Sequence, residues 1–124
     1  MIPQVPKKIM VIDDDYMILT TLNIVLTDYG YTVVVSIDNR RALRHIRKHL
    51  PDLLILDVMM PGKNGMEILS EVKKDRELRS IPIMLISSAA NLSHIAQLHH
   101  ADAFLEKPFS LEKLESMVER ILPH

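Results

Sequence analysis

The sequence contains no cysteine, which excludes a disulfide framework, a thiol nucleophile and a cysteine-based zinc site. No apolar run approaches the roughly 18 residues that a membrane-spanning helix needs. The N-terminal stretch MIPQVPKK also lacks the long apolar core of a signal peptide. These absences predict a cytoplasmic protein with no membrane partner.

The chain carries little excess charge of either sign. Its formal net charge is −1, which argues against a domain whose main role is direct nucleic-acid binding. A run of five basic residues near position 44 leaves two interpretations open, a solvated helix face or a patch for an acidic partner or nucleic acid. The neutral total favours the solvated face.

The length of 124 residues suits one compact domain with a proper core. The sequence is 48% apolar and 25% charged, an ordinary globular balance. It contains no internal repeat, low-complexity tract or linker. We therefore predict a single domain over residues 1–124, in which residues 1–6, with two prolines, form an irregular lead-in.

Five short apolar or β-branched runs are typical of strands. These runs are Ile9–Ile12, Tyr31–Val35, Leu53–Leu56, Ile83–Ile86 and Ala103–Leu105. Apolar residues at helical spacing, with plausible caps at Asp15, Asp38 and Ser110, predict a helix after each run. The predicted helices are Met17–Tyr29, Asp38–His49, Gly65–Asp75, Leu92–His100 and Leu111–Ile121.

The second of these helices is expected to turn Ala42, Leu43, Ile46 and Leu50 inward and to stop before Pro51. The order is strand then helix, five times over. That alternation indicates an α/β fold with a five-stranded parallel sheet, doubly wound so that helices cover both faces.

Residues capable of chemistry follow four of the five predicted strands. They are the acidic run Asp13–Asp15, Asp57, the pair Ser87 and Ser88, and Lys107. The carboxyl ends of parallel strands meet at one edge of the sheet, where open α/β sheets bind their ligands. We therefore expect these side chains to be neighbours in the folded protein.

Carboxylates brought together in a partly desolvated cleft repel one another, and a divalent cation relieves that repulsion. A small set of oxygen ligands suits Mg²⁺ better than a caged Ca²⁺. With Lys107 and the Ser87 hydroxyl, the cluster suits a phosphoryl group, and Asp57 becomes a candidate carboxylate nucleophile. Taken singly, each feature also has an ordinary structural interpretation. The acidic run could simply mark the start of a helix, Ser87 could be a turn residue, and Lys107 could be a surface lysine.

The arrangement of these motifs resembles the receiver domain of two-component response regulators over nearly the whole chain. The matching motifs are Asp13-Asp14, Asp57 followed by MMPGKNG, Ser87 after IPIMLI, and ADAFLEKPF with Lys107-Pro108. The resemblance implies a flavodoxin-like sheet in the order 2-1-3-4-5 with five helices.

The resemblance also implies a role for each matching residue. Asp57 would accept a phosphoryl group from a phosphohistidine of a histidine kinase or phosphotransfer protein, catalysing only its own phosphorylation and dephosphorylation. Asp13, Asp14, Asp57 and the backbone carbonyl of Met59 would hold Mg²⁺. Ser87 and Lys107 would bind the phosphoryl group. Phe104 would follow the movement of Ser87, and Pro108 would follow a bond that the family commonly holds in cis.

Two features depart from the family pattern. His100 occupies a position that is usually glycine, and the segment between Ser88 and Lys107 is about two residues shorter than in the chemotaxis-type member. Both changes affect the fourth helix and its exit turn. That region belongs to the face of the fourth helix, fifth strand and fifth helix, where the resemblance implies an output partner or effector domain.

The resemblance also implies two positions that set the lifetime of a phosphorylated form. In a receiver, the side chains two residues beyond the phosphoacceptor and two beyond the switch hydroxyl are best placed to orient the hydrolytic water, and here they would be Met59 and Ala89. Neither binds water strongly, so we expect slow self-dephosphorylation.

Two alternative functions remain. The run from Ile12 to Asp15 also fits the start of a haloacid-dehalogenase-like phosphatase, with Asp13 as its nucleophile. That family needs a further acidic pair, and a chain of this length has no obvious room for one. A receiver-like interaction module without phosphorylation would be marked by loss of an acidic residue, and none is lost.

Overall fold

The computed structural model describes residues 5–88, 92–98 and 100–122. Its core is one parallel sheet in the strand order β2-β1-β3-β4-β5, as predicted. The strands are β1 (Lys8–Ile12), β2 (Thr32–Ser36), β3 (Leu53–Asp57), β4 (Ile83–Ser87) and β5 (Ala103–Glu106). In these ranges no helix is both long and apolar enough to cross a bilayer.

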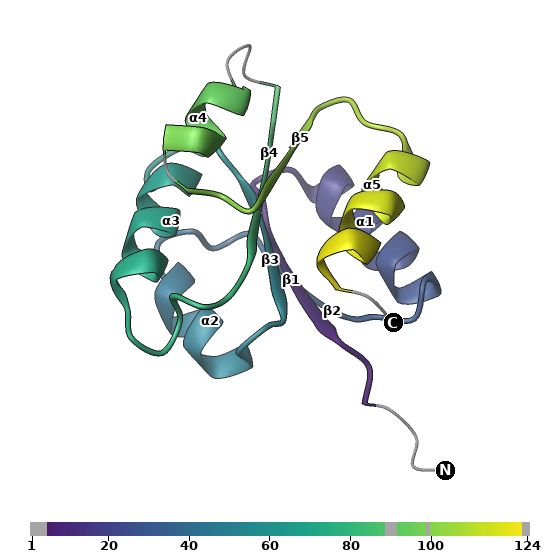
Figure 1. Ribbon diagram of the computed structural model, residues 1–124, viewed down its shortest axis with the longest axis horizontal. Helices are drawn as coiled ribbons and strands as arrows, with labels where there is room; N and C mark the ends of the chain where they lie inside the picture. The colour runs from purple at the N-terminus through teal and green to yellow at the C-terminus, as the bar shows by residue number, and fades with distance from the viewer. Residues whose placement is uncertain (1–4, 89–91, 99, 123–124) are drawn as a thin grey trace.

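Helices cover both faces of the sheet (Figure 1). One face carries α1 (Tyr16–Asp28) and α5 (Leu111–Ile121). The other carries α2 (Ala42–His49), α3 (Gly65–Lys74) and α4 (Leu92–Leu98). The predicted doubly wound, flavodoxin-like architecture is therefore confirmed.

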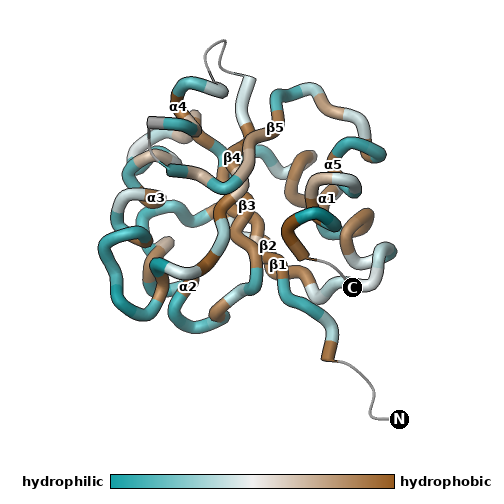
Figure 2. The backbone as a smooth tube through the Cα atoms, in the orientation of Figure 1, coloured by the Kyte–Doolittle hydropathy of each residue, from teal (hydrophilic) through white to brown (hydrophobic). Residues whose placement is uncertain are grey.

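The central strands are buried on both faces, as their continuous apolar runs indicate. All five residues of β3 and of β4 are buried. Alternate side chains enter two apolar clusters, so Leu54 and Leu56 pack under α2 and α3, whereas Leu53 and Ile55 pack under α1 and α5. Figure 2 shows hydrophobic residues concentrated along the strands, with hydrophilic residues outside.

Three helix starts follow from short polar side chains that accept a hydrogen bond from the first turn. Asp15 accepts from the amide of Met17, and Ser110 accepts from that of Lys113, as their predicted capping roles require. Asn64 does the same for α3 by accepting from Glu67. These caps fix where the helices leave the edge of the sheet at which the candidate site lies.

The prediction that Asp38 caps the second helix is wrong. Its carboxylate accepts from the amides of Arg40 and Arg41, which form a turn, and α2 begins only at Ala42. Leu50 does not face inward either. It ends α2 in the left-handed region at φ 44° and is 54% exposed, because the chain turns there toward Pro51.

The fourth helix ends earlier than predicted, at Leu98 rather than His100. His100 has φ 59°, a left-handed conformation that cannot continue an α-helix. The amides of His100 and Ala101 donate to the carbonyls of Gln97 and Ala96, which closes the end of the helix. The family's usual glycine at this position has a physical reason, because only glycine adopts this conformation without strain.

Candidate functional site

Four strands deliver the candidate residues to one edge of the sheet. Ile12 pairs with Leu56, so Asp13 and Asp57 leave neighbouring strands at the same level. Ser87 ends β4 beside Glu106, and Lys107 follows directly. The predicted convergence at the carboxyl edge is therefore present in the structure.

Three carboxylates form a compact cluster at this edge. Asp13, Asp14 and Asp57 each offer an oxygen, and these oxygens all lie within 4.8 Å of one another. Asp13 is fully buried and Asp57 is 3% exposed, whereas Asp14 faces solvent. The cluster therefore opens outward on one side, where a ligand or partner can reach it.

Lys107 supplies the positive charge opposite these carboxylates. Its Nζ donates to Asp13 Oδ2 at 2.9 Å and lies 3.6 Å from Asp57 Oδ1. The other oxygen of Asp13 accepts from the amide of Asp15 at 3.0 Å, so both Asp13 oxygens are engaged. The Lys107–Pro108 peptide bond is cis, as the resemblance implied.

The electrostatics of the site penalise a second buried negative charge. Burial, and then the neighbouring Asp13 carboxylate, raise the pKa of Asp57 to about 7, although Lys107 opposes this. Burial lowers the pKa of Lys107, but the hydrogen bond and charge of Asp13 outweigh it, so the net shift is upward. One ammonium does not fully compensate three carboxylates, and the site retains an affinity for a further cation.

The donor set fits Mg²⁺. Within the described residues, the group that could hold a metal consists of carboxylates alone, and exposed Asp14 leaves the cluster open to water. The family resemblance implies Mg²⁺ at this acidic cluster. Asp13, Asp14, Asp57 and the Met59 carbonyl are the groups that would hold it here.

A close approach of backbones shapes the floor of the site. A Cβ on Gly65 would lie 2.1 Å from the carbonyl oxygen of Asp57, which no side chain can tolerate. The amide of Gly65 donates to the carbonyl of Val58, and the amide of Val58 donates to that of Ile86. Glycine at position 65 therefore lets α3 begin directly against the end of β3.

The remaining predicted residues occupy different surroundings. Ser87 is buried beside Lys107, and its carbonyl accepts from the Lys107 amide at 2.9 Å. Met59 is 64% exposed, and Phe104 is 38% exposed on β5. Ala89, predicted to tune dephosphorylation, lies outside the described residues.

Sequence reasoning missed Asn39. This residue lies between β2 and α2 and is 9% exposed, and its side-chain amide donates to the carbonyls of Pro61 and Lys63. An asparagine after an aspartate indicates a turn. Nothing local shows that its partners lie 22 and 24 residues away.

Comparison with known proteins decides the family. A family model described as "Response regulator receiver domain" matches residues 9–119, which include every candidate residue of the site. The chain belongs to this family. It is a receiver domain of the two-component response regulators, the class whose members act as phosphoacceptors.

Curated relatives of this receiver domain are longer regulators. It is 33% identical over 117 residues to the alkaline phosphatase synthesis transcriptional regulatory protein PhoP of Bacillus subtilis, covering 94% of this chain and 48% of PhoP. It is 34% identical over 119 residues to the response regulator MprA of Mycolicibacterium vanbaalenii, covering 94% of this chain and 51% of MprA. The chain thus spans about half the length of these relatives.

Solved receiver structures share the fold throughout. The chemotaxis protein CheY4 of Vibrio cholerae superposes with a TM-score of 0.87 at 28% identity, covering 95% of this chain and 100% of that one. NtrX of Brucella abortus gives a TM-score of 0.85 at 30% identity, covering 95% of this chain but 28% of NtrX. Membership of this family does not favour the haloacid-dehalogenase alternative.

Proposed function

We propose that Asp57 is the phosphoacceptor of this receiver domain and takes its phosphoryl group from a phosphohistidine of a histidine kinase or phosphotransfer protein. The observation that carries the proposal is the cluster of three carboxylate oxygens within 4.8 Å, with the Lys107 ammonium 2.9 Å from Asp13 and 3.6 Å from Asp57. An acidic run that only started a helix would not need a half-buried lysine that follows the edge strand β5.

The transfer exchanges one phosphorus bond for another. A carboxylate oxygen of Asp57 attacks the phosphorus, the bond from phosphorus to the histidine nitrogen breaks, and an acyl phosphate forms. Asp57 must be ionised to attack, so cations that draw its pKa of about 7 downward also prepare it as the nucleophile. The imidazole leaves with the electron pair of the broken bond and recovers a proton from solvent.

The other residues of the site act on the phosphoryl oxygens. We propose that Lys107, 3.6 Å from Asp57, pairs with one of them and that the hydroxyl of buried Ser87 donates to another. Mg²⁺ held by Asp13, Asp14, Asp57 and the Met59 carbonyl would neutralise charge that develops on those oxygens. These roles would account for a half-buried ammonium and a buried serine at this edge of the sheet.

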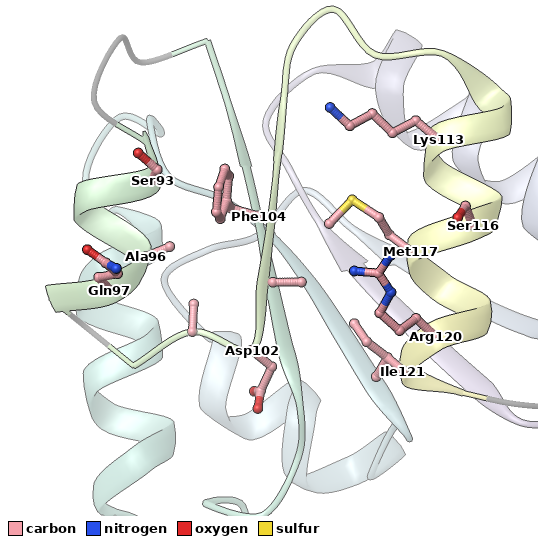
Figure 3. A pocket seen from close by; sticks show the side chains of 12 residues that line it. Ser93, Ala96, Gln97, Asp102, Phe104, Lys113, Ser116, Met117, Arg120 and Ile121 are labelled. Carbon is pink, nitrogen blue, oxygen red and sulfur yellow. The ribbon is translucent and has the colours of Figure 1, made fainter.

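We further propose that phosphorylation is read out on the face formed by α4, β5 and α5. A groove of about 620 Å³ lies on this face, and Figure 3 shows Phe104 between α4 and β5, with Met117 and Ile121 from α5 across the strand. Phe104 is part of the groove and lies on the strand that leads directly to Lys107. The backbone between Lys107 and Phe104 therefore connects the phosphoryl site directly to this surface.

The domain organisation is part of the same proposal. We propose that residues 1–124 form one receiver domain. Support comes from the single sheet, which involves every described strand, and from a family match that spans residues 9–119. Output domains belong to the longer relatives, and their activities are not assigned to this chain.

The test is uptake of a phosphoryl group from acetyl phosphate, followed by the mass of the intact protein. We expect a gain of one phosphoryl mass with Mg²⁺ present and none with EDTA. Asp57→Asn should abolish uptake. Asp52→Asn, at the opposite end of the same strand, should leave it unchanged.

Peptide mapping of the labelled protein separates the alternatives. Label on Asp13 would support the phosphatase-like nucleophile, and uptake by the Asp57→Asn protein at position 57 would refute the proposal. Absence of any uptake with Mg²⁺ present would favour the interaction module without phosphorylation.

A further inference from the structure

Asn39 makes two hydrogen bonds to a loop on a different part of the sheet. Its Nδ2 donates to the carbonyl of Pro61 at 2.8 Å and to that of Lys63 at 2.7 Å. Both partners are acceptors only, so the amide nitrogen and not the amide oxygen must face them. The two amide protons are used in full, and the side chain is 9% exposed.

These bonds anchor the segment that follows the phosphoacceptor. At its start, the carbonyl of Val58 accepts from the amide of Gly65 at 3.1 Å. Beyond it, Asn39 holds Pro61 and Lys63. Met59 lies between the two anchor points, one residue after Val58 and two residues before Pro61.

Another side-chain contact of this loop is an ion pair. Lys63 Nζ lies 2.6 Å from Glu71, and these side chains are 24% and 40% exposed. Because solvent reaches both side chains, we expect the pair to contribute about 1 kcal/mol. Gly62, at φ 81°, adds a flexible residue to the middle of the loop.

Val58 and Met60 are buried in the core cluster and hold the first half of the loop. The bonds of Asn39 are the buried polar contacts that hold its second half, from Pro61 to Lys63.

We propose that Asn39 is a positioning residue for the magnesium site: it holds the Pro61–Lys63 turn and thereby keeps the Met59 carbonyl in place as a metal ligand. This inference rests on the proposed function, which gives that carbonyl a role. Mg²⁺ demands near-ideal octahedral geometry, so a loosened carbonyl ligand weakens its binding directly. Removal of such supporting hydrogen bonds typically costs 10- to 100-fold in metal affinity.

The experiment compares Mg²⁺ affinity by calorimetry in the metal-stripped wild type, Asn39→Ala and Asn39→Leu. Leu keeps the branched shape and the number of heavy atoms of Asn and adds no charge, so it remains informative where Ala lowers stability. We expect both variants to bind Mg²⁺ about tenfold more weakly. Lys63→Gln breaks the exposed ion pair of the same loop and should stay within about twofold of wild type.

A second measurement does not need the metal. Amide exchange of Gly65 in the metal-free protein reports whether the loop opens, because that amide donates to Val58. We expect its exchange to be about tenfold faster in the Asn39 variants and unchanged in Lys63→Gln. A structural role confined to packing would lower the unfolding temperature and leave both readouts at the wild-type value.

Unchanged Mg²⁺ affinity in a folded Asn39→Leu protein would overturn the inference, and so would a wild type that binds no Mg²⁺. Failure of the proposed function looks different. A wild type that binds Mg²⁺ but takes no phosphoryl group from acetyl phosphate would refute the phosphoacceptor role, while the affinity comparison would still test Asn39.

Discussion

At the scale of single residues, the acid pocket is a place where the fold accepts unfavourable electrostatics. Asp57 is 3% exposed beside the fully buried Asp13, and Lys107 offsets only part of their repulsion. A carboxylate kept there for its chemistry should cost the metal-free protein stability whenever it is ionised. Two predictions concern individual side chains of this site.

The first prediction is that Asp57→Asn stabilises the metal-free protein at neutral and alkaline pH. The folded pKa of about 7 lies above the ordinary aspartate value of 3.8, so the folded state holds the proton more tightly. The stability that Asp57 contributes is therefore complete below pH 4 and is lost as pH rises to about 7. Asn carries no charge at any pH and does not lose stability in this way. We therefore expect the free energy of unfolding of Asp57→Asn to exceed that of wild type by about 2–4 kcal/mol above pH 7.

Urea unfolding in EDTA at several pH values measures this effect. The difference between Asp57→Asn and wild type should be small near pH 4 and grow toward pH 7. Asp28→Asn, an exposed carboxylate on α1, serves as the control and should show no such growth. A difference that is constant with pH would contradict the assigned cause.

The second prediction concerns the lifetime of the acyl phosphate. Met59 is exposed, and the sequence predicts that Ala89 occupies the second water-orienting position. Neither a thioether nor a methyl group can hold a water strongly. Installing Asn at position 59 and Glu at position 89 should speed phosphate loss roughly 10²-fold. The decay of the phosphorylated mass after removal of the donor measures the rate. Loss within seconds in the unmodified protein, or no change in the double variant, would refute this explanation.

At the scale of elements, the ends of the helices decide where each functional residue lies. α3 starts at Gly65 only because that residue has no Cβ to meet the carbonyl of Asp57. α4 has seven residues and, like α2, its exit passes through a non-glycine residue with positive φ. The strain at His100 makes this helix a target for a stability test.

We predict that His100→Gly stabilises the protein by about 1 kcal/mol, because glycine adopts the left-handed conformation without the clash of a Cβ. Urea unfolding measures the change. His94→Gly is the matched control, because His94 lies at an exposed position inside α4. This variant should be about 0.5–1 kcal/mol less stable than wild type. Equal effects of the two substitutions would contradict the assigned strain.

At the scale of the whole molecule, the phosphoacceptor and the α4–β5–α5 face belong to one connected region. β5 carries Phe104 and ends beside Lys107, and β4 carries Ser87 and leads toward α4 (Figure 1). Leu85 of β4 pairs with Phe104, so the two strands that would carry the switch are in direct register. A phosphoryl group that draws Ser87 inward would free space for Phe104 and shift a two-state equilibrium of the face.

Beryllofluoride, a phosphoryl mimic, tests this coupling. We predict amide chemical-shift changes at Ser87, along α4 and at Phe104 when beryllofluoride and Mg²⁺ are added together. Asp57→Asn should show none of them, because the mimic needs the carboxylate. Changes limited to the acid pocket would mean that the face does not respond.

The sequence by itself determined the strands, the doubly wound architecture and which residues reach the carboxyl edge. Short apolar runs and their breakers are local signals, and parallel pairing then aligns Asp13, Asp57, Ser87 and Lys107 by necessity. The same signals placed Asp15 and Ser110 as helix caps correctly. They misplaced Asp38 and Leu50, because the turn before α2 and its exit depend on how the chain enters and leaves the sheet.

Only the tertiary structure decided the distances and the burial on which the chemistry depends. Lys107 reaches Asp13 across 94 residues, and Asn39 reaches Pro61 and Lys63 across a separate strand. The pKa of Asp57 rises to about 7 because folding buries it against Asp13. Electrostatic interaction and desolvation depend on separation through space and on solvent access. Neither quantity exists for a residue until the strands have paired and the helices have covered them.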